Sequence, residues 1–183
     1  VATNGETTMN KTDLPSVINM TVTNDDSFLS PYSPTETPVI SAEVAEFLQT
    51  CAKPYKADST LQLQIHSNSI DEKEKIVYSH AIRNYFNLQL EETAEELRRN
   101  TLVSLIFAVV GILGLAAMIV LDSFKVQSIW LECVDIFSWV FLWEAVDQMF
   151  IRRRQLQIKR KRMHAFVNME VVYIPVRTSA KSV

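Results

Sequence analysis

The sequence predicts a membrane α-helical hairpin of two transmembrane helices, joined to a small α+β cytoplasmic domain and a disordered N-terminal tail. Residues 101–121 contain no charged side chain. At about 1.5 Å of rise per residue, a helix of that length crosses roughly 30 Å of hydrocarbon. Residues 129–150 form a second apolar run of similar length, and a basic run follows it directly. Two such runs with a short connector between them predict the hairpin.

The first segment, residues 1–40, is rich in Thr, Asn, Ser and Pro, with Phe28 and Tyr32 as its only aromatic residues. Such a composition buries too little apolar surface to offset the entropy lost on ordering, so it predicts a disordered tail. Residues 30–38 contain three prolines and fit either an extended partner-binding segment or a solvated linker.

Residues 41–97, completed by residues 165–176, are predicted to form the cytoplasmic domain. Ser41 is a suitable N-cap for a helix whose apolar residues recur on one face. Residues 61–65 alternate with period two, and residues 167–174 form a second strand-like run. Because an isolated pair of strands is marginally stable, we expect another copy of the chain to supply further strands.

Charges beside the two runs predict the orientation in the membrane. Arg98 and Arg99 precede the first run and basic residues follow the second, whereas the connector, residues 122–128, contains a single basic residue, Lys125. Positive charge is enriched on the cytoplasmic side, so both termini are predicted to be cytoplasmic.

Residues 151–164 lack Gly and Pro and are predicted to form a basic cytoplasmic helix, with residues 177–183 as a flexible C-terminus. Acidic residues of the opposite helix, Glu91 to Glu96, are expected to lie at the same level. Anionic lipid headgroups are the competing partner of the basic side chains, and nucleic-acid binding is not expected because such runs ordinarily set topology. The basic side chains are Arg152, Arg153, Arg154, Lys159, Arg160, Lys161 and Arg162.

The second apolar run carries acidic side chains, and at about 100° per residue they share a polar and aromatic face with two tryptophans. Its members are Glu132, Asp135, Trp139, Trp143, Glu144 and Asp147. A charge at the bilayer centre costs about 2.5–3.5 kcal/mol, so the acids are expected to face protein or water. Three uses fit this face: hydrogen bonding between helices of an oligomer, a cation or proton path, and docking of another membrane protein.

The first apolar run offers a complementary packing surface of small residues at a spacing of three or four. Small side chains let helix backbones approach closely. The residues expected to pack are Ser104, Ala108, Gly111 and Gly114.

Enzymatic and metal-binding signatures are not found in the sequence. The three histidines are scattered, and neither Cys51 nor Cys133 lies at metal-binding distance from a histidine in the chain. Only three glycines are present, which excludes a glycine-rich phosphate loop. We therefore expect no catalytic residue, no cofactor and no metal.

The second run, with Trp139 to Glu144, followed by three arginines and a basic helix, resembles a group of uncharacterised bacterial two-span membrane proteins. The resemblance covers roughly residues 60–174. It implies a strand, a charged helix, a tryptophan-containing hairpin and a terminal strand in a bacterial inner membrane, with no activity to carry over.

These observations predict a non-enzymatic integral membrane protein, an oligomeric structural or protein-interaction component that presents its cytoplasmic domain to another membrane or cytoplasmic protein. The alternative is an oligomeric cation or proton channel lined by the acids of residues 129–150. Two spans cannot enclose a pore, so the alternative requires several copies of the chain.

Overall fold

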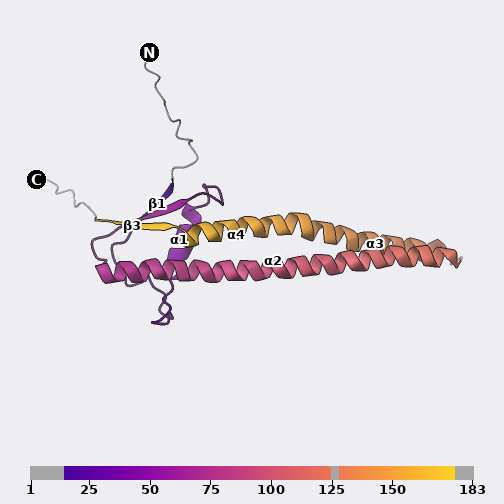
Figure 1. The fold of residues 1–183 in the computed structure, drawn as a ribbon, viewed down its shortest axis with the longest axis horizontal. Helices are drawn as coiled ribbons and strands as arrows, with labels where there is room; N and C mark the ends of the chain where they lie inside the picture. The colour runs from indigo at the N-terminus through magenta and orange to yellow at the C-terminus, as the bar shows by residue number, and fades with distance from the viewer. Residues whose placement is uncertain (1–14, 125–127, 176–183) are drawn as a thin grey trace, which may run out of the picture. The chain divides into compact units, whose positions relative to one another are not determined.

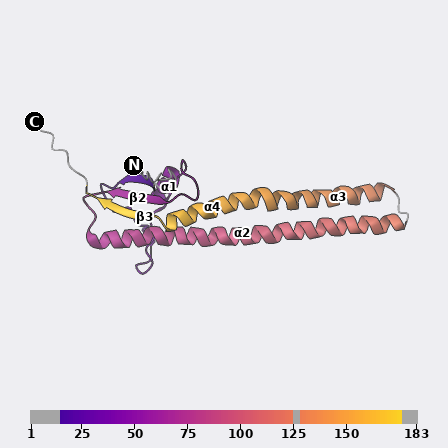
Figure 2. The ribbon, with the colours of Figure 1, turned by 45° about the horizontal axis from the view of Figure 1, so that its top comes forward.

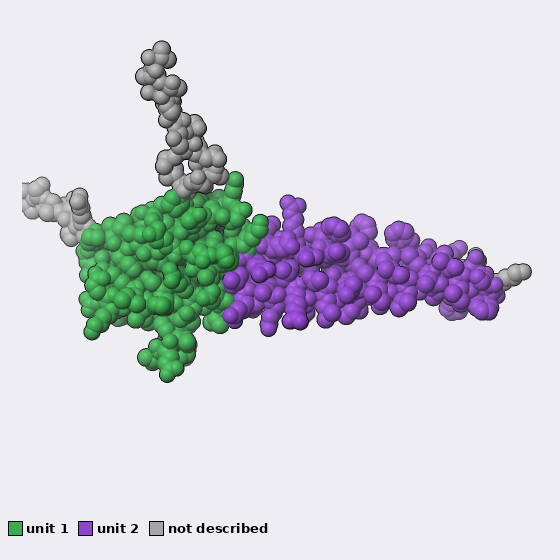
Figure 3. All heavy atoms as spheres, in the orientation of Figure 1, with its two compact units in different colours: residues 1–89, 161–183 green, residues 90–160 purple. Residues whose placement is uncertain are grey.

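The computed structural model describes residues 15–124 and 128–175 (Figure 1). The elements are β1 (Ser16–Thr21), α1 (Ala42–Cys51), β2 (Leu61–His66), α2 (Glu72–Ser123), α3 (Ser128–Asp147), the π-helical turn η1 (Gln148–Arg152), α4 (Arg153–Val167) and β3 (Glu170–Ile174). They divide into unit 1, residues 1–89 and 161–183, and unit 2, residues 90–160 (Figure 3). The predicted flexible segment 177–183 and Lys125 lie outside the described residues.

Unit 1 contains a three-stranded parallel sheet in the order β1-β2-β3 (Figure 2). The central strand has its alternate residues Leu61, Leu63 and Ile65 buried, while the intervening polar residues are half-buried. Ile18 pairs with Leu63, and Tyr173 pairs with Ile65. The period-two pattern therefore directs one face of β2 into the core of unit 1.

The predicted disordered tail is wrong for residues 15–40, because β1 is an edge strand of this sheet. Its ladder is extended at both ends by hydrogen bonds from Ser16 N to Thr60 O, at 2.8 Å, and from Val22 N to His66 O, at 2.9 Å. Ile18 and Ile40 are only 2% and 1% exposed. The composition of residues 1–40, averaged over the whole segment, is polar, so it did not indicate that these few apolar residues are buried. The third strand comes from the same chain, so no second copy is needed to supply it.

The core of unit 1 is closed by residues from α1, α2 and α4. Ser41 Oγ accepts a hydrogen bond from Val44 N at 3.5 Å, which caps α1 at the position that the sequence predicts. Leu48 of α1 is fully buried. Phe86 of α2 stacks on Phe166 of α4, with ring centroids 4.3 Å apart, and both side chains have no exposed surface.

Unit 2 is an antiparallel pair of helices formed by α2 with α3, η1 and the start of α4. Asn100 contacts Gln148, Gly111 lies against Leu142 and Gly114 against Ser138, so rising numbers on α2 meet falling numbers on η1 and α3. The inward residues of α2 repeat every seven residues, as in a coiled-coil seam. They are Asn100, Ser104, Phe107, Gly111, Gly114, Met118 and Leu121, all buried or half-buried.

The predicted two-span membrane hairpin is wrong, because α2 alone among the described helices is long and apolar enough to cross a membrane. The predicted first span, residues 101–121, lies inside this 52-residue helix. In contrast, α3 carries four acidic residues within its 20 residues. The predicted second span also ends inside η1, where the α-helical hydrogen bonding is interrupted. The structure therefore provides one candidate span, and a two-pass topology has no support.

Candidate functional site

The apolar stretch of α2 is mostly uncovered in the chain. Only 11% of its most apolar segment is buried. Its outward side chains are 47–68% exposed, and they are Leu102, Leu105, Ile106, Val109, Ile112, Leu113, Ile119 and Val120. Soluble proteins rarely leave an apolar surface of this extent in water, and such patches mark contact with a membrane or a partner. The stretch thus indicates that the chain associates with a membrane.

Small residues bring α3 close to this helix inside unit 2. A Cβ atom added at Gly111 would lie 2.7 Å from Leu142 Cγ, and one added at Gly114 would overlap Ser138 Oγ. Ser138 has no exposed surface, Ser104 is 6% exposed and Ala108 is half-buried. Gly111 and Gly114 therefore lie against α3, and Ser104 is buried on the same side of α2.

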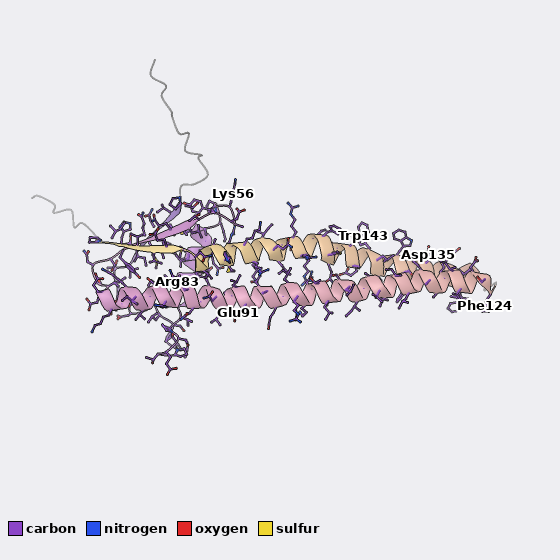
Figure 4. All side chains as sticks on the ribbon, viewed as in Figure 1. Lys56, Arg83, Glu91, Phe124, Asp135 and Trp143 are labelled. Carbon is purple, nitrogen blue, oxygen red and sulfur yellow. The ribbon has the colours of Figure 1, made fainter. Side chains whose placement is uncertain are left out.

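The acidic and aromatic residues of α3 do not form one sheltered face. Trp139 and Trp143 are 60% and 72% exposed. Trp143 points away from α2 (Figure 4). Glu132 and Glu144 are exposed as well, while Asp135 is half-buried at the edge of the seam. Asp147, the sixth residue of the predicted face, is also half-buried. The residues that contact α2 are instead the small and apolar ones between them.

A polar cluster lies where the apolar stretch of α2 begins. Asn100 Nδ2 donates to the backbone oxygen of Gln148 at 2.9 Å, and both residues are buried, with 7% and 8% exposure. The same oxygen accepts the N–H of Arg153, which is the wider hydrogen bond of the π-helical turn. Gln148 Nε2 donates to Glu144 Oε1 at 2.9 Å. This cluster was not predicted from the sequence, although Asn100, at the polar end of an apolar run, was a signal for it.

A hollow of about 220 Å³ lies next to this cluster, between α2 and the η1–α4 segment. Arg99 and Arg152 contribute its cationic groups, and Asn100 and Gln148 its amides. Val103 and Leu156 form its apolar wall. The hollow thus combines positive charge, hydrogen-bonding groups and apolar surface.

The basic run surrounds its helix rather than forming one face. Lys159 Nζ lies 3.1 Å from Glu96 Oε2, which is one of the acid–base contacts expected between these helices. Both side chains are about 40% exposed, so the pair contributes only about 0–1 kcal/mol. Arg153 Nε is buried without a hydrogen-bond partner among the described residues. The remaining members, Arg152, Arg154, Arg160 and Lys161, are exposed, and Arg162 is half-buried.

Two tyrosines of unit 1 hold distant segments to α2. Tyr78 OH donates to Asp25 Oδ2 at 2.9 Å, and its ring stacks on Phe28. Burial and the nearby Asp25 carboxylate raise the pKa of Tyr78 well above its usual value. Tyr173 OH of β3 donates to Lys75 O at 2.9 Å, and burial raises its pKa also. Both hydroxyls therefore act as protonated donors at neutral pH.

The part of the chain that the structure describes contains no cluster of three His, Cys, Asp or Glu residues that could hold a metal. Cys51 is half-buried and Cys133 is exposed, and neither forms a disulfide.

No protein-family model, curated protein or solved structure matches this chain. The resemblance to the bacterial membrane proteins stays a prediction for the origin of the chain, and its two-span architecture does not apply. The fold and the exposed stretch of α2 define a membrane-associated chain with one candidate spanning helix and a small parallel-sheet unit.

Proposed function

We propose that this chain is a non-enzymatic, membrane-anchored structural or protein-interaction component. The apolar stretch of α2 serves as its anchor, and unit 1 is the part that meets partners. The observation that carries the proposal is the exposed apolar surface of α2, which is continuous over the predicted first span. In water this surface would be costly, at about 25 cal/mol for each Å² of apolar area.

The proposed location is the inner (plasma) membrane, with the N-terminal side of α2 in the cytoplasm. Arg98 and Arg99, directly before the apolar stretch, support this orientation through the positive-inside preference. The earlier expectation of a cytoplasmic C-terminus depended on a second span and is not part of the proposal.

The proposal includes association with further copies of the chain or with another membrane protein. Glu132 and Glu144 are exposed beside apolar side chains and tryptophans. Carboxylates in such surroundings are stabilised when another helix supplies a hydrogen-bond donor. Their exposure therefore favours a neighbouring protein surface over lipid at this side of α3.

The alternative proposal is a cation or proton path in an oligomer, in which several copies arrange the half-buried Asp135 and the exposed Glu144 in rings. The double variant Asp135→Asn and Glu144→Gln separates the two uses. Loss of ion flux with intact assembly supports conduction, whereas weaker assembly, measured by particle mass in nanodiscs, supports a packing role.

Membrane extraction tests the anchor itself. The double variant Leu105→Arg and Ile112→Arg places two charges on exposed positions of α2, each at a cost of about 2.5–3.5 kcal/mol in the bilayer centre. We expect this variant to leave carbonate-washed membranes, while the control Glu91→Arg and Glu95→Arg, also at exposed positions, stays bound. Wild-type protein that remains in the supernatant would overturn the proposal.

A further inference from the structure

The hollow of unit 2 lies at the level where α2 changes from charged to apolar. Arg99 lies two residues before Thr101, the start of the charge-free stretch. No hydrogen bond or ion pair to another described residue holds the Arg99 or Arg152 guanidinium. The one acid that lines the hollow, Glu96, is already paired with Lys159. The hollow therefore presents two guanidinium groups that no ion pair with a described residue engages.

We propose that this hollow binds the phosphate headgroup of an anionic phospholipid, an inference that rests on the proposed membrane anchoring of α2. A guanidinium presents a planar fork of N–H donors that matches two phosphate oxygens at once. Two such groups on opposite helices can hold one phosphate from both sides. The buried amides of Asn100 and Gln148 line the hollow beside the two guanidinium groups.

The π-helical turn shapes this hollow. Because Gln148 O accepts the N–H of Arg153, the turn contains one residue more than an α-helical turn. Asn100 of the opposite helix donates to the same oxygen, which fixes the two helices in register at this level. Gln148 is buried, and the next buried side-chain atom on this side is Arg153 Nε, five positions on rather than three or four. Turns of this kind are frequent at functional sites.

Apolar surface next to the hollow favours a lipid over a free phosphate ion. Val103 and Leu156 line the hollow itself. Ile106, one helical turn beyond Val103 on α2, is 53% exposed and extends the apolar surface on that side of the helix. A free phosphate would have no use for this wall, whereas the acyl chains of a phospholipid would cover it.

Native mass spectrometry of the full chain in detergent tests the site with phosphatidylglycerol and, as the zwitterionic comparison, phosphatidylcholine. The site variant is Arg99→Gln with Arg152→Gln. Its matched control is Arg98→Gln with Arg154→Gln, which removes the same charge from exposed positions that do not line the hollow. Thermal unfolding by circular dichroism verifies that each variant is folded.

We expect the site variant to bind phosphatidylglycerol about 30-fold more weakly, since it loses the charge-assisted hydrogen bonds from two guanidinium groups to one phosphate. The control should change the affinity by less than about threefold, because its charges are free in solvent. The variant Arg99→Lys with Arg152→Lys should bind with intermediate affinity, since it keeps the charge and loses the planar fork.

Equal losses in the site variant and its control would overturn the inference, since they would indicate attraction by surface charge alone. Displacement of the lipid by millimolar inorganic phosphate would also overturn it, by identifying free phosphate as the ligand. Sedimentation with membranes separates this inference from the proposed anchoring. Wild-type protein that sediments but shows no preference for phosphatidylglycerol refutes the lipid site alone, whereas protein that does not sediment refutes the anchoring.

Discussion

Replacing Gly114 with alanine is expected to weaken the pairing of α2 with α3, although the same change at an open helix position is stabilising. Alanine is favoured over glycine by about 1 kcal/mol in a helix interior. At Gly114 the added Cβ atom would overlap Ser138 Oγ and lie 3.1 Å from Ser138 Cβ. Overpacking of this kind costs about 1–3 kcal/mol, so the steric cost exceeds the gain in helix propensity.

Ser138 has little freedom to move away from such a methyl group. Its side chain is fully buried, and its hydroxyl donates to Val134 O at 2.7 Å. We therefore expect Gly114→Ala to lower the free energy of unfolding by about 1 kcal/mol, and by up to about 2. Adding Ser138→Gly removes the opposing atoms, so the double variant should return to within about 0.5 kcal/mol of the wild type.

The measurement is reversible unfolding in mild detergent titrated with dodecyl sulfate. Circular dichroism follows the helices, and fluorescence follows α3, where all three tryptophans lie. Ala117→Gly, at an exposed position of α2, calibrates helix propensity and should cost about 1 kcal/mol. The reasoning is refuted if Gly114→Ala stabilises the protein by about the same amount, or if Ser138→Gly fails to rescue it.

Three further predictions concern the core, the tyrosines and the π-helical turn. Phe166→Ala should lower the stability of unit 1 by about 3–5 kcal/mol, since its ring is fully buried against Phe86; urea unfolding followed by circular dichroism measures this loss, and a change below about 1 kcal/mol would contradict it. The pKa of Tyr78 is raised in the folded state, so its contribution to the free energy of unfolding should be complete below pH 10, the ordinary tyrosine pKa, and decrease above it. Between neutral pH and pH values above 10, the free energy of unfolding should therefore fall less in the Tyr78→Phe variant than in the wild type. Deleting Met149 should convert η1 into an ordinary α-helical turn with little loss of thermal stability. Deleting Ile158 instead turns the following residues by about 100° around the helix axis, so this variant should unfold at a clearly lower temperature. Equal losses of thermal stability in the two deletion variants would argue against the extra residue in η1.

Several elements follow from local sequence patterns. The alternation of residues 61–65 lies within β2, and Ser41 caps α1 through the side-chain oxygen that its residue type provides. The charge-free stretch 101–121 lies within α2 and satisfies the length and polarity that a membrane span needs. Each of these features depends on residues close together in the chain, so a short window contains the information.

Other features depend on contacts between residues far apart in sequence. Residues 15–22 lack a strong strand pattern of their own, and β1 forms because Leu63 and Ile65 of β2 offer a buried surface beside it. The prediction that α3 forms a second membrane span was wrong for a related reason. Apolar length alone suggested a span, while the four acids of the helix were assigned to an interior face that the structure does not form.

The sequence by itself determined the cap of α1, the alternation of β2 and the stretch of α2 that is long and apolar enough to meet a membrane. Only the tertiary structure decided that the sheet is parallel with β2 at its centre, and that Asn100 meets Gln148 at a π-helical turn. The physical reason is the range of the interactions. Helix propensity, capping and hydropathy act over a few residues. Strand partners and the relative phase of two helices are set by packing across 40 or more residues of intervening chain, as between Asn100 and Gln148.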